Sequence, residues 1–365
     1  MGAIHEYGCG LLLHNRNVCH QVYVKPPLNL YFDNYMSAKP RSFRCKLPYQ
    51  KLNSGFKEED AIDTAEMSEQ EIWLALPSFE NEEKAELLVG LSARAGYRGA
   101  GGEALEFAKS ALSIYEALGA TAPATDVADC HLAIATAYRL LLQNDEAIDE
   151  IDIAIALHND SGYPFLDDLF RTRATWCFDM YDWEGSIESH LECIKKHEIE
   201  GNDVWAAKSW LDLGICYSRL TNYPKAISAL DKARELFKSH KLIYEYAQCE
   251  RWLAEGYAEI GDGQRALKCA RNSMTVAEFV QQRVPRMHSL FVLGKAMVVL
   301  ADFEDAERYL LQAAEAAVMC SQSEMDWEFI LKVQRERADL LHLQKRFDDA
   351  EELQTRILTV EEIIE

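Results

Sequence analysis

The chain has 365 residues, of which 48% are hydrophobic, and this is enough to bury a sizeable core. No stretch approaches the roughly eighteen apolar residues of a transmembrane helix, and no signal-peptide core is evident, so we expect a cytoplasmic protein without a membrane partner. The formal net charge of −22 opposes binding to nucleic acid, and we expect no such partner. The same charge either favours basic partners or simply keeps the protein soluble.

The first 66 residues differ in composition from the rest of the chain. They hold eight Lys or Arg and seven Asp or Glu residues, a net charge of +1, so the remainder carries −23. They also contain four of the nine prolines and show no helical period. We therefore predict an irregular N-terminal arm over residues 1–66 and a helical domain over residues 67–365. An alternative is that residues 1–66 are an upstream extension of the reading frame, because helical sequence opens smoothly at Met67.

Beyond residue 67, small residues recur at a period of about forty. Spaced 39 to 44 residues apart, the anchor positions of this repeat are Ala104, Ala147, Ser186, Ala226, Ala266, Ala306 and Ala350. A small residue also stands twelve positions before every anchor, and seven positions after six of the seven. Repetition at this length is typical of a solenoid of stacked units. Two antiparallel helices approach to about 8–10 Å only where small residues meet, so each unit is predicted to be a helix-turn-helix pair.

The unit around residues 210–238 carries the most complete motif. Its matching positions are Trp210, Leu213, Gly214 and Tyr217, then a turn with Pro224, then Ala226, Leu230 and Ala233. This set resembles the tetratricopeptide repeat, although Lys238 stands where the family places a late proline. The resemblance covers roughly residues 79–365 and implies an all-α, right-handed superhelical solenoid of about seven units. The period near forty exceeds the family's usual length of 34 and is similar to that of its long-repeat members.

The sequence carries no recognised catalytic motif. The glycine cluster at residues 99–102 is not followed by Lys and Ser or Thr, so it is not a phosphate-binding loop. The motifs His-Glu-x-x-His, Gly-x-Ser-x-Gly and Cys-x-x-Cys are absent, and the His and Cys residues of the arm have spacings that fit no zinc site. Cys177, Cys193 and Cys216 occupy inward positions and are expected to be free thiols. We therefore expect a non-enzymatic protein with no cofactor and no metal.

The resemblance also implies where a ligand binds. In the family the first helices of the units line a concave groove, and the matching positions here contain Arg171, Thr175, Lys208, Asp212, Arg251, Trp252, Glu255, Lys295 and Arg335. The Lys and Asn pair with which some members grip a C-terminal carboxylate is absent. The basic residues either pair with neighbouring acids, Asp339 among them, or meet acidic groups of an extended peptide or partner helix.

From these observations we interpret the chain as a protein- or peptide-binding scaffold or adaptor. Two alternatives stay open. One is a peptide-responsive regulator in which binding changes the superhelical pitch, and the other is a sensor subunit that acts on a separate enzyme. Fold resemblance does not separate these functions.

The last predicted helix carries an apolar stripe formed by Leu353, Ile357, Val360 and Ile364. Contiguous exposed apolar surface usually marks an interface. Either the first helix of the same unit covers the stripe, or two copies of the chain form a homodimer in which the terminal helices cover each other.

Overall fold

The computed structural model of the chain describes residues 69–79, 81–161, 166–319 and 327–364. The arm predicted over residues 1–66, and its boundary at Met67, lie outside the described residues. The described residues fold into helices and contain no strand, which confirms the predicted all-α class. None of these helices is both long enough and apolar enough to cross a membrane.

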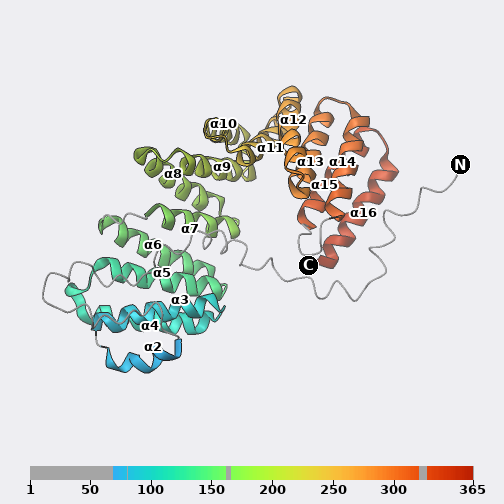
Figure 1. The fold of residues 1–365 in the computed structure, drawn as a ribbon. Coiled ribbons are helices and arrows are strands. Elements are labelled where there is room, and N and C mark those ends of the chain that lie inside the picture. Colours follow the sequence, from blue (N-terminus) through green and yellow to red (C-terminus); the bar gives the residue numbers. More distant parts are fainter. Residues whose placement is uncertain (1–68, 80, 162–165, 320–326, 365) are drawn as a thin grey trace. The chain divides into compact units, whose positions relative to one another are not determined.

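The helices form two units. The N-terminal unit, blue to green in Figure 1, contains α2 (Glu69–Ala75), η4 (Leu76–Ser78), α3 (Asn81–Tyr97), α4 (Gly101–Leu118), η5 (Gly119–Thr121), α5 (Ala124–Leu140), α6 (Asn144–Ser161), α7 (Leu166–Asp179), α8 (Trp183–Glu200) and α9 (Asp203–Arg219). The C-terminal unit contains α10 (Tyr223–Ser239), α11 (Ile243–Glu259), α12 (Gly263–Val280), α13 (Arg283–Val299), α14 (Phe303–Val318), α15 (Trp327–Leu343) and α16 (Phe347–Ile364). Consecutive helices within a unit pack on one another, as α5 does on α6 and α13 on α14.

The predicted anchor positions are buried, as expected of sites where helices meet. All seven anchors are at most 2% exposed, and the residues twelve positions before and seven positions after them are buried too. In the N-terminal unit the Ser92 hydroxyl donates a hydrogen bond of 2.7 Å to the carbonyl of Ala104, which joins α3 to α4. In the C-terminal unit a Cβ placed on Gly294 would lie 2.7 Å from the side chain of Leu310. Only small side chains fit at such a close approach.

The turns inside the repeats share one backbone conformation. Five positions before each anchor, φ is positive, between 56° and 81°, at Gly99, Leu142, Tyr181, Thr221, Gly261, Ala301 and Lys345. This left-handed conformation ends the first helix of a repeat, and glycine adopts it most easily. The next residue caps the second helix in four of the repeats, because its side-chain oxygen accepts a hydrogen bond from the backbone N–H three residues later. These capping residues are Asp182, Asn222, Asp262 and Asp302.

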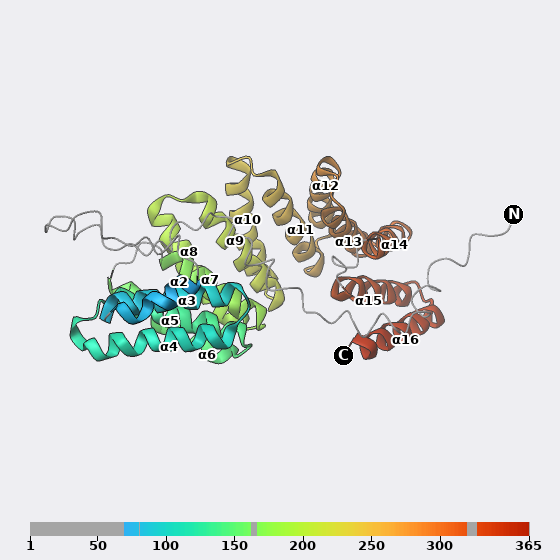
Figure 2. The ribbon, with the colours of Figure 1, turned by 60° about the horizontal axis from the view of Figure 1, so that its bottom comes forward.

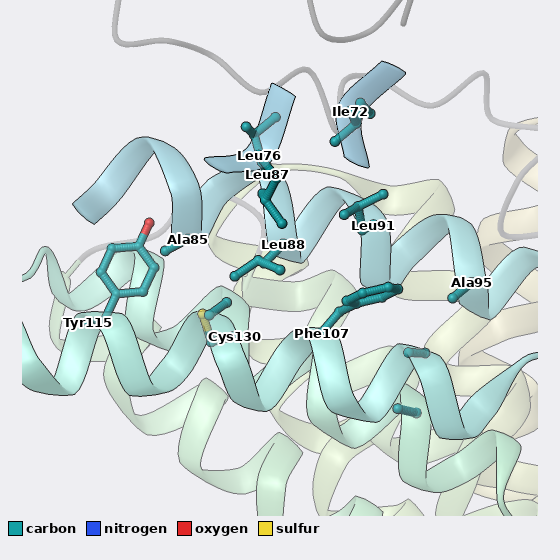
Figure 3. Close-up of a cluster of buried hydrophobic side chains, with 13 residues drawn as sticks. Ile72, Leu76, Ala85, Leu87, Leu88, Leu91, Ala95, Phe107, Tyr115 and Cys130 are labelled. Carbon is teal, nitrogen blue, oxygen red and sulfur yellow. The ribbon is translucent and has the colours of Figure 1, made fainter. Parts of the chain in front are cut away.

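A hydrophobic core closes the beginning of the N-terminal unit (Figure 3). Ile72 and Leu76 of the short helices α2 and η4 share this core with Leu91 of α3, and Phe107 and Tyr115 of α4 complete it. Leu91 and Tyr115 are at most 1% exposed. The short helices therefore cover apolar surface that the first helix pair of a stack would otherwise leave exposed.

The C-terminal unit ends with α15 and α16, which lie side by side (Figure 2). On α16, Ile357 is 7% exposed, whereas Leu353 and Val360 are half-buried. The side chain of Ile364 lies outside the described residues. Part of the predicted stripe is thus covered within the chain, and the homodimer stays a prediction.

Candidate functional site

The predicted contact residues lie on the first helices of the repeats. Arg171 and Thr175 belong to α7, and Lys208 and Asp212 belong to α9, all in the N-terminal unit. The other predicted residues belong to α11, α13 and α15 of the C-terminal unit. Each unit therefore presents its own set of predicted contact residues.

In the N-terminal unit two cations share one aromatic ring. The Cζ atom of Arg171 lies 4.6 Å from the centre of the Trp205 ring, and the Nζ atom of Lys208 lies 4.1 Å from it. Arg171 also forms an ion pair of 2.6 Å with Asp168, one turn earlier in α7. With Asp212, these residues form what we call the Trp205 cluster. Each cation–π contact contributes about 0.5–1 kcal/mol at a partly exposed site and holds its cation in place.

Asp212 is the acidic residue nearest to these cations along α9. Burial raises the pKa of its carboxyl to about 7, although the charges of Lys208 and Arg171 act in the opposite direction. At neutral pH a share of the molecules therefore carries this carboxyl in its uncharged, protonated form. Since Asp168 supplies the other negative charge, the Trp205 cluster keeps an excess of positive charge in a chain whose net charge is −22.

Two neighbouring residues add no charge to this cluster. His190 of α8 is 4% exposed, and burial together with the charge of Arg171 lowers its pKa to about 4, so its ring is neutral at pH 7. The Thr175 hydroxyl donates a hydrogen bond of 3.0 Å to the carbonyl of Arg171, within α7. The charge of the cluster is therefore set by its two cations and two acids.

In the C-terminal unit the cations are paired with carboxylates. The Nζ atom of Lys332 lies 2.6 Å from an oxygen of Glu255. Lys295 forms ion pairs with Glu259 and, at 3.5 Å, with Glu336. We call these five residues the Lys295 cluster. Burial opposes the charge of Lys295, but the glutamates outweigh burial and raise its pKa. Burial likewise opposes the charge of Glu255, yet the two lysines lower its pKa. Two lysines thus face three carboxyl groups, and no positive charge is left in excess.

Arg251 and Trp252 stand next to each other on α11. The Cζ atom of Arg251 lies 5.2 Å from the centre of the Trp252 ring. Arg251 also borders a mainly apolar pocket of about 200 Å³, whose other lining residues are Tyr244, Ala247, Gln248, Ser273, Val276, Ala277, Val280, Val284, Pro285 and His288. Burial, helped by nearby cations, holds the pKa of His288 well below its ordinary value, so that ring is neutral. The pocket can accept an apolar side chain beside a cation.

Arg335 of α15 lies apart from these contacts. Its guanidinium forms an ion pair with Glu361 of α16, and 61% of its side chain is exposed. The pair joins the two helices at the surface. Because a surface ion pair contributes only about 0–1 kcal/mol, Arg335 can exchange Glu361 for another acid at little cost.

Sequence reasoning missed the residues that organise both clusters. Trp205 stands in the first turn of α9, outside the offsets taken from the family, although its spacing of three from Lys208 places both on one helix face. That spacing is a signal that could have identified it. Glu259 and Glu336 were also missed, because they approach Lys295 from α11 and α15 and are 36 and 41 residues away in sequence.

The described residues offer little for metal chemistry. No group of three or more His, Cys, Asp or Glu side chains is arranged there to hold a metal ion. Cys177, Cys193 and Cys216 are buried and free, as predicted. Burial raises the pKa of each thiol, to about 12 at Cys177 and Cys193 and to about 11 at Cys216, so these groups are protonated at pH 7.

No protein-family model and no curated protein matches the sequence, but solved structures match the fold. The apo form of RapI is 16% identical over 77% of this chain and 98% of its own, with a TM-score of 0.54. NprR in complex with its cognate peptide NprX is 16% identical over 77% of this chain and 80% of its own, with a TM-score of 0.50.

A third similar structure is a signal-transduction ATPase with numerous domains from Pyrococcus horikoshii, which carries a tetratricopeptide repeat sensor. It is 13% identical over 80% of this chain, with a TM-score of 0.56, and the match spans 44% of the ATPase. These similarities confirm a helical repeat fold of the tetratricopeptide type.

Proposed function

We propose that the chain is a non-enzymatic, cytoplasmic scaffold or adaptor that binds a peptide or protein segment along its first helices. The observation that carries this proposal is the Trp205 cluster, where two cations from successive first helices rest on one aromatic ring. An acidic side chain or a terminal carboxylate of the partner can meet both cations at once. Asp212 opposes such a ligand only weakly, because its carboxyl takes up a proton near pH 7.

The similar structures support a peptide as the ligand. NprR was solved with its cognate peptide, and the archaeal ATPase carries its repeats as a sensor. They also favour the alternative of a peptide-responsive regulator, or of a sensor subunit for a separate enzyme. Small-angle scattering distinguishes the regulator hypothesis from the scaffold hypothesis. A change in the radius of gyration on binding supports a regulator, whereas a stable complex in which the chain keeps its dimensions supports a scaffold.

The test is capture of partners from a cell lysate by the tagged full chain, followed by mass spectrometry and titration of the enriched partner. We expect Arg171→Glu together with Lys208→Glu to weaken binding by about a hundredfold or more, because two attractions become repulsions. The matched control is Lys195→Glu, which makes the same charge change at a side chain of α8 that is 69% exposed. It should bind as the unmodified chain does.

The milder variant Arg171→Gln with Lys208→Gln guards against misfolding, and the helical circular dichroism signal of every variant is measured alongside. Undiminished capture by the folded double variants would contradict the proposal. Loss of binding in Lys195→Glu alone would place the partner on the second helices instead.

A further inference from the structure

A larger pocket of the C-terminal unit lies on a different side of α11. It encloses about 480 Å³ between α10, α11 and α12, and its lining residues are Arg234, Glu235, Lys238, Tyr246, Glu250, Tyr257, Arg265, Lys268, Cys269 and Asn272. Tyr246, Glu250 and Tyr257 are spaced by four and seven residues and so share one face of α11. With 3.6 residues per turn, Arg251 and Glu255 are turned away from Glu250 by about 100° and about 140°. This pocket is therefore separate from the contact residues of the first-helix face.

The inner part of the pocket contains a carboxyl group with an unused acceptor. Glu250 is only 2% exposed, and its Oε2 atom has no hydrogen-bond partner among the described residues. Burial, followed by the charge of Glu250 and side-chain hydrogen bonds to its carboxyl, raises the pKa values of Tyr246 and Cys269. Both neighbours are therefore protonated at pH 7, and Oε2 is the carboxyl oxygen that they leave without a donor. A buried acceptor without a donor costs about 1–3 kcal/mol. A ligand that donates a hydrogen bond to Oε2 would recover part of this energy.

The mouth of the pocket is cationic. Lys238 and Lys268 are exposed and form no ion pair within the described part of the chain. Arg234 and Arg265 also line the pocket, but acids already share their charges. Arg234 pairs with Asp231 at 3.0 Å and with the lining residue Glu235 at 3.4 Å, and Arg265 pairs with Asp262 at 3.2 Å. The lining thus combines an unsatisfied carboxyl oxygen inside with available positive charge outside. This order of charges runs against the acidic character of the whole chain, whose net charge is −22.

We infer that this pocket binds a small amphoteric molecule of the amino-acid class, with a protonated nitrogen at one end and a carboxylate at the other. The nitrogen donates to Oε2 of Glu250, beside the ring of Tyr246, which attracts cations. The ring of Tyr257 already faces a cation, because Cζ of Arg265 lies 5.5 Å from its centre. The carboxylate meets Lys238 and Lys268 at the mouth. The volume of the pocket lies within the roughly 300–1,000 Å³ typical of small-molecule sites.

A ligand with a single charge fits this lining less well. A plain anion satisfies the lysines but leaves Glu250 without a donor, and a plain cation satisfies Glu250 but must approach through a positive mouth. A molecule that carries both charges gains at both places.

The test is calorimetric titration of the full chain with glycine, 4-aminobutyrate and 6-aminohexanoate, which separate the two charges by increasing lengths. We expect one of them to bind at millimolar concentration or below. The matched amine and the matched carboxylate of the same length, for example hexylamine and hexanoate, should each bind at least about tenfold more weakly. Failure of all three amino acids to bind, or equal binding of a single-charged analogue, would overturn the inference.

Variants locate the binding. Glu250→Gln keeps the shape of the side chain and should weaken binding about tenfold or more, as should Lys238→Gln combined with Lys268→Gln. The control Lys225→Gln, at an exposed position of α10 outside the pocket, should leave affinity unchanged. The double lysine variant decides the matter if Glu250→Gln fails to fold, because both lysines are exposed. Unchanged affinity in the lysine variant would rule out this pocket as the site.

Discussion

The Trp205 cluster of the N-terminal unit and the Lys295 cluster of the C-terminal unit use the same repeat positions in different ways. Lys208 and Lys332 both stand eighteen residues before an anchor, and Asp212 and Glu336 both stand fourteen before one. In the first cluster an aromatic ring holds Lys208, and burial raises the pKa of Asp212 to about 7, which weakens its negative charge at neutral pH. In the second cluster, carboxylates hold both lysines. A basic position in a repeat groove is therefore available to a ligand only where its own neighbours leave its charge unmatched.

The strongest test of this comparison removes one cation from each cluster. Lys295→Met leaves two carboxyl groups without their partner at a site where the lysine side chain is 11% exposed, so we expect a loss of about 2–3 kcal/mol in unfolding free energy. Lys208→Met removes a contact with Trp205 and should cost about 1 kcal/mol or less. Denaturant unfolding followed by circular dichroism measures both. Equal losses would remove the distinction between a structural and an available cation.

One acid from each cluster, Asp212 and Glu255, should also respond to pH in opposite ways, and Asp212 shows the first direction. Its pKa of about 7 in the folded chain lies above the value near 4 of an unfolded aspartate. The folded state thus holds more protons between pH 4 and pH 7, and the contribution of Asp212 to stability falls as pH rises through this window. Asp212→Asn should therefore be about 1–2 kcal/mol more stable than the unmodified chain at pH 8 and nearly equal to it at pH 4.

Glu255 shows the other direction. The lysines lower its pKa below the ordinary value of 4.5, so its stabilising contribution is present above that pH and is lost as pH falls through the folded pKa. Glu255→Gln should lose about 1–2 kcal/mol at pH 8 and less at pH 3, when measured by the same unfolding titration. A destabilised Asp212→Asn, or a stabilised Glu255→Gln, at pH 8 would contradict the assignment of the two environments.

The fold was accessible from the sequence because its main constraint is steric and local to each repeat. Ala226 and Gly294 are small since helices touch there, and that requirement recurs at a fixed period. The clusters were less accessible because their pairing is spatial. The residues near Lys295 in sequence do not indicate that Glu336 of α15 forms an ion pair with it. Likewise, the pKa of Asp212 depends on how deeply its side chain is buried in the folded chain. The spacing of residues in the sequence could thus identify charged positions on the first helices, but it could not predict which of these charges form ion pairs within the chain.

The turns, unlike the clusters, should behave alike in both units. Leu142 and Ala301 adopt the same left-handed conformation, with φ of 61° and 58°, and neither residue type signals it. This conformation costs a residue with a side chain about 1–2 kcal/mol, and glycine avoids that strain. Glycine also makes the unfolded chain more flexible, and this offsets part of the gain in stability. Leu142→Gly and Ala301→Gly should therefore each gain about 0.5–1 kcal/mol. The control Ala117→Gly, at an exposed helical position of α4, should lose stability. Thermal unfolding followed by circular dichroism gives all three values. A gain in only one unit would show that the units differ in their backbone frame and not only in how they match charge.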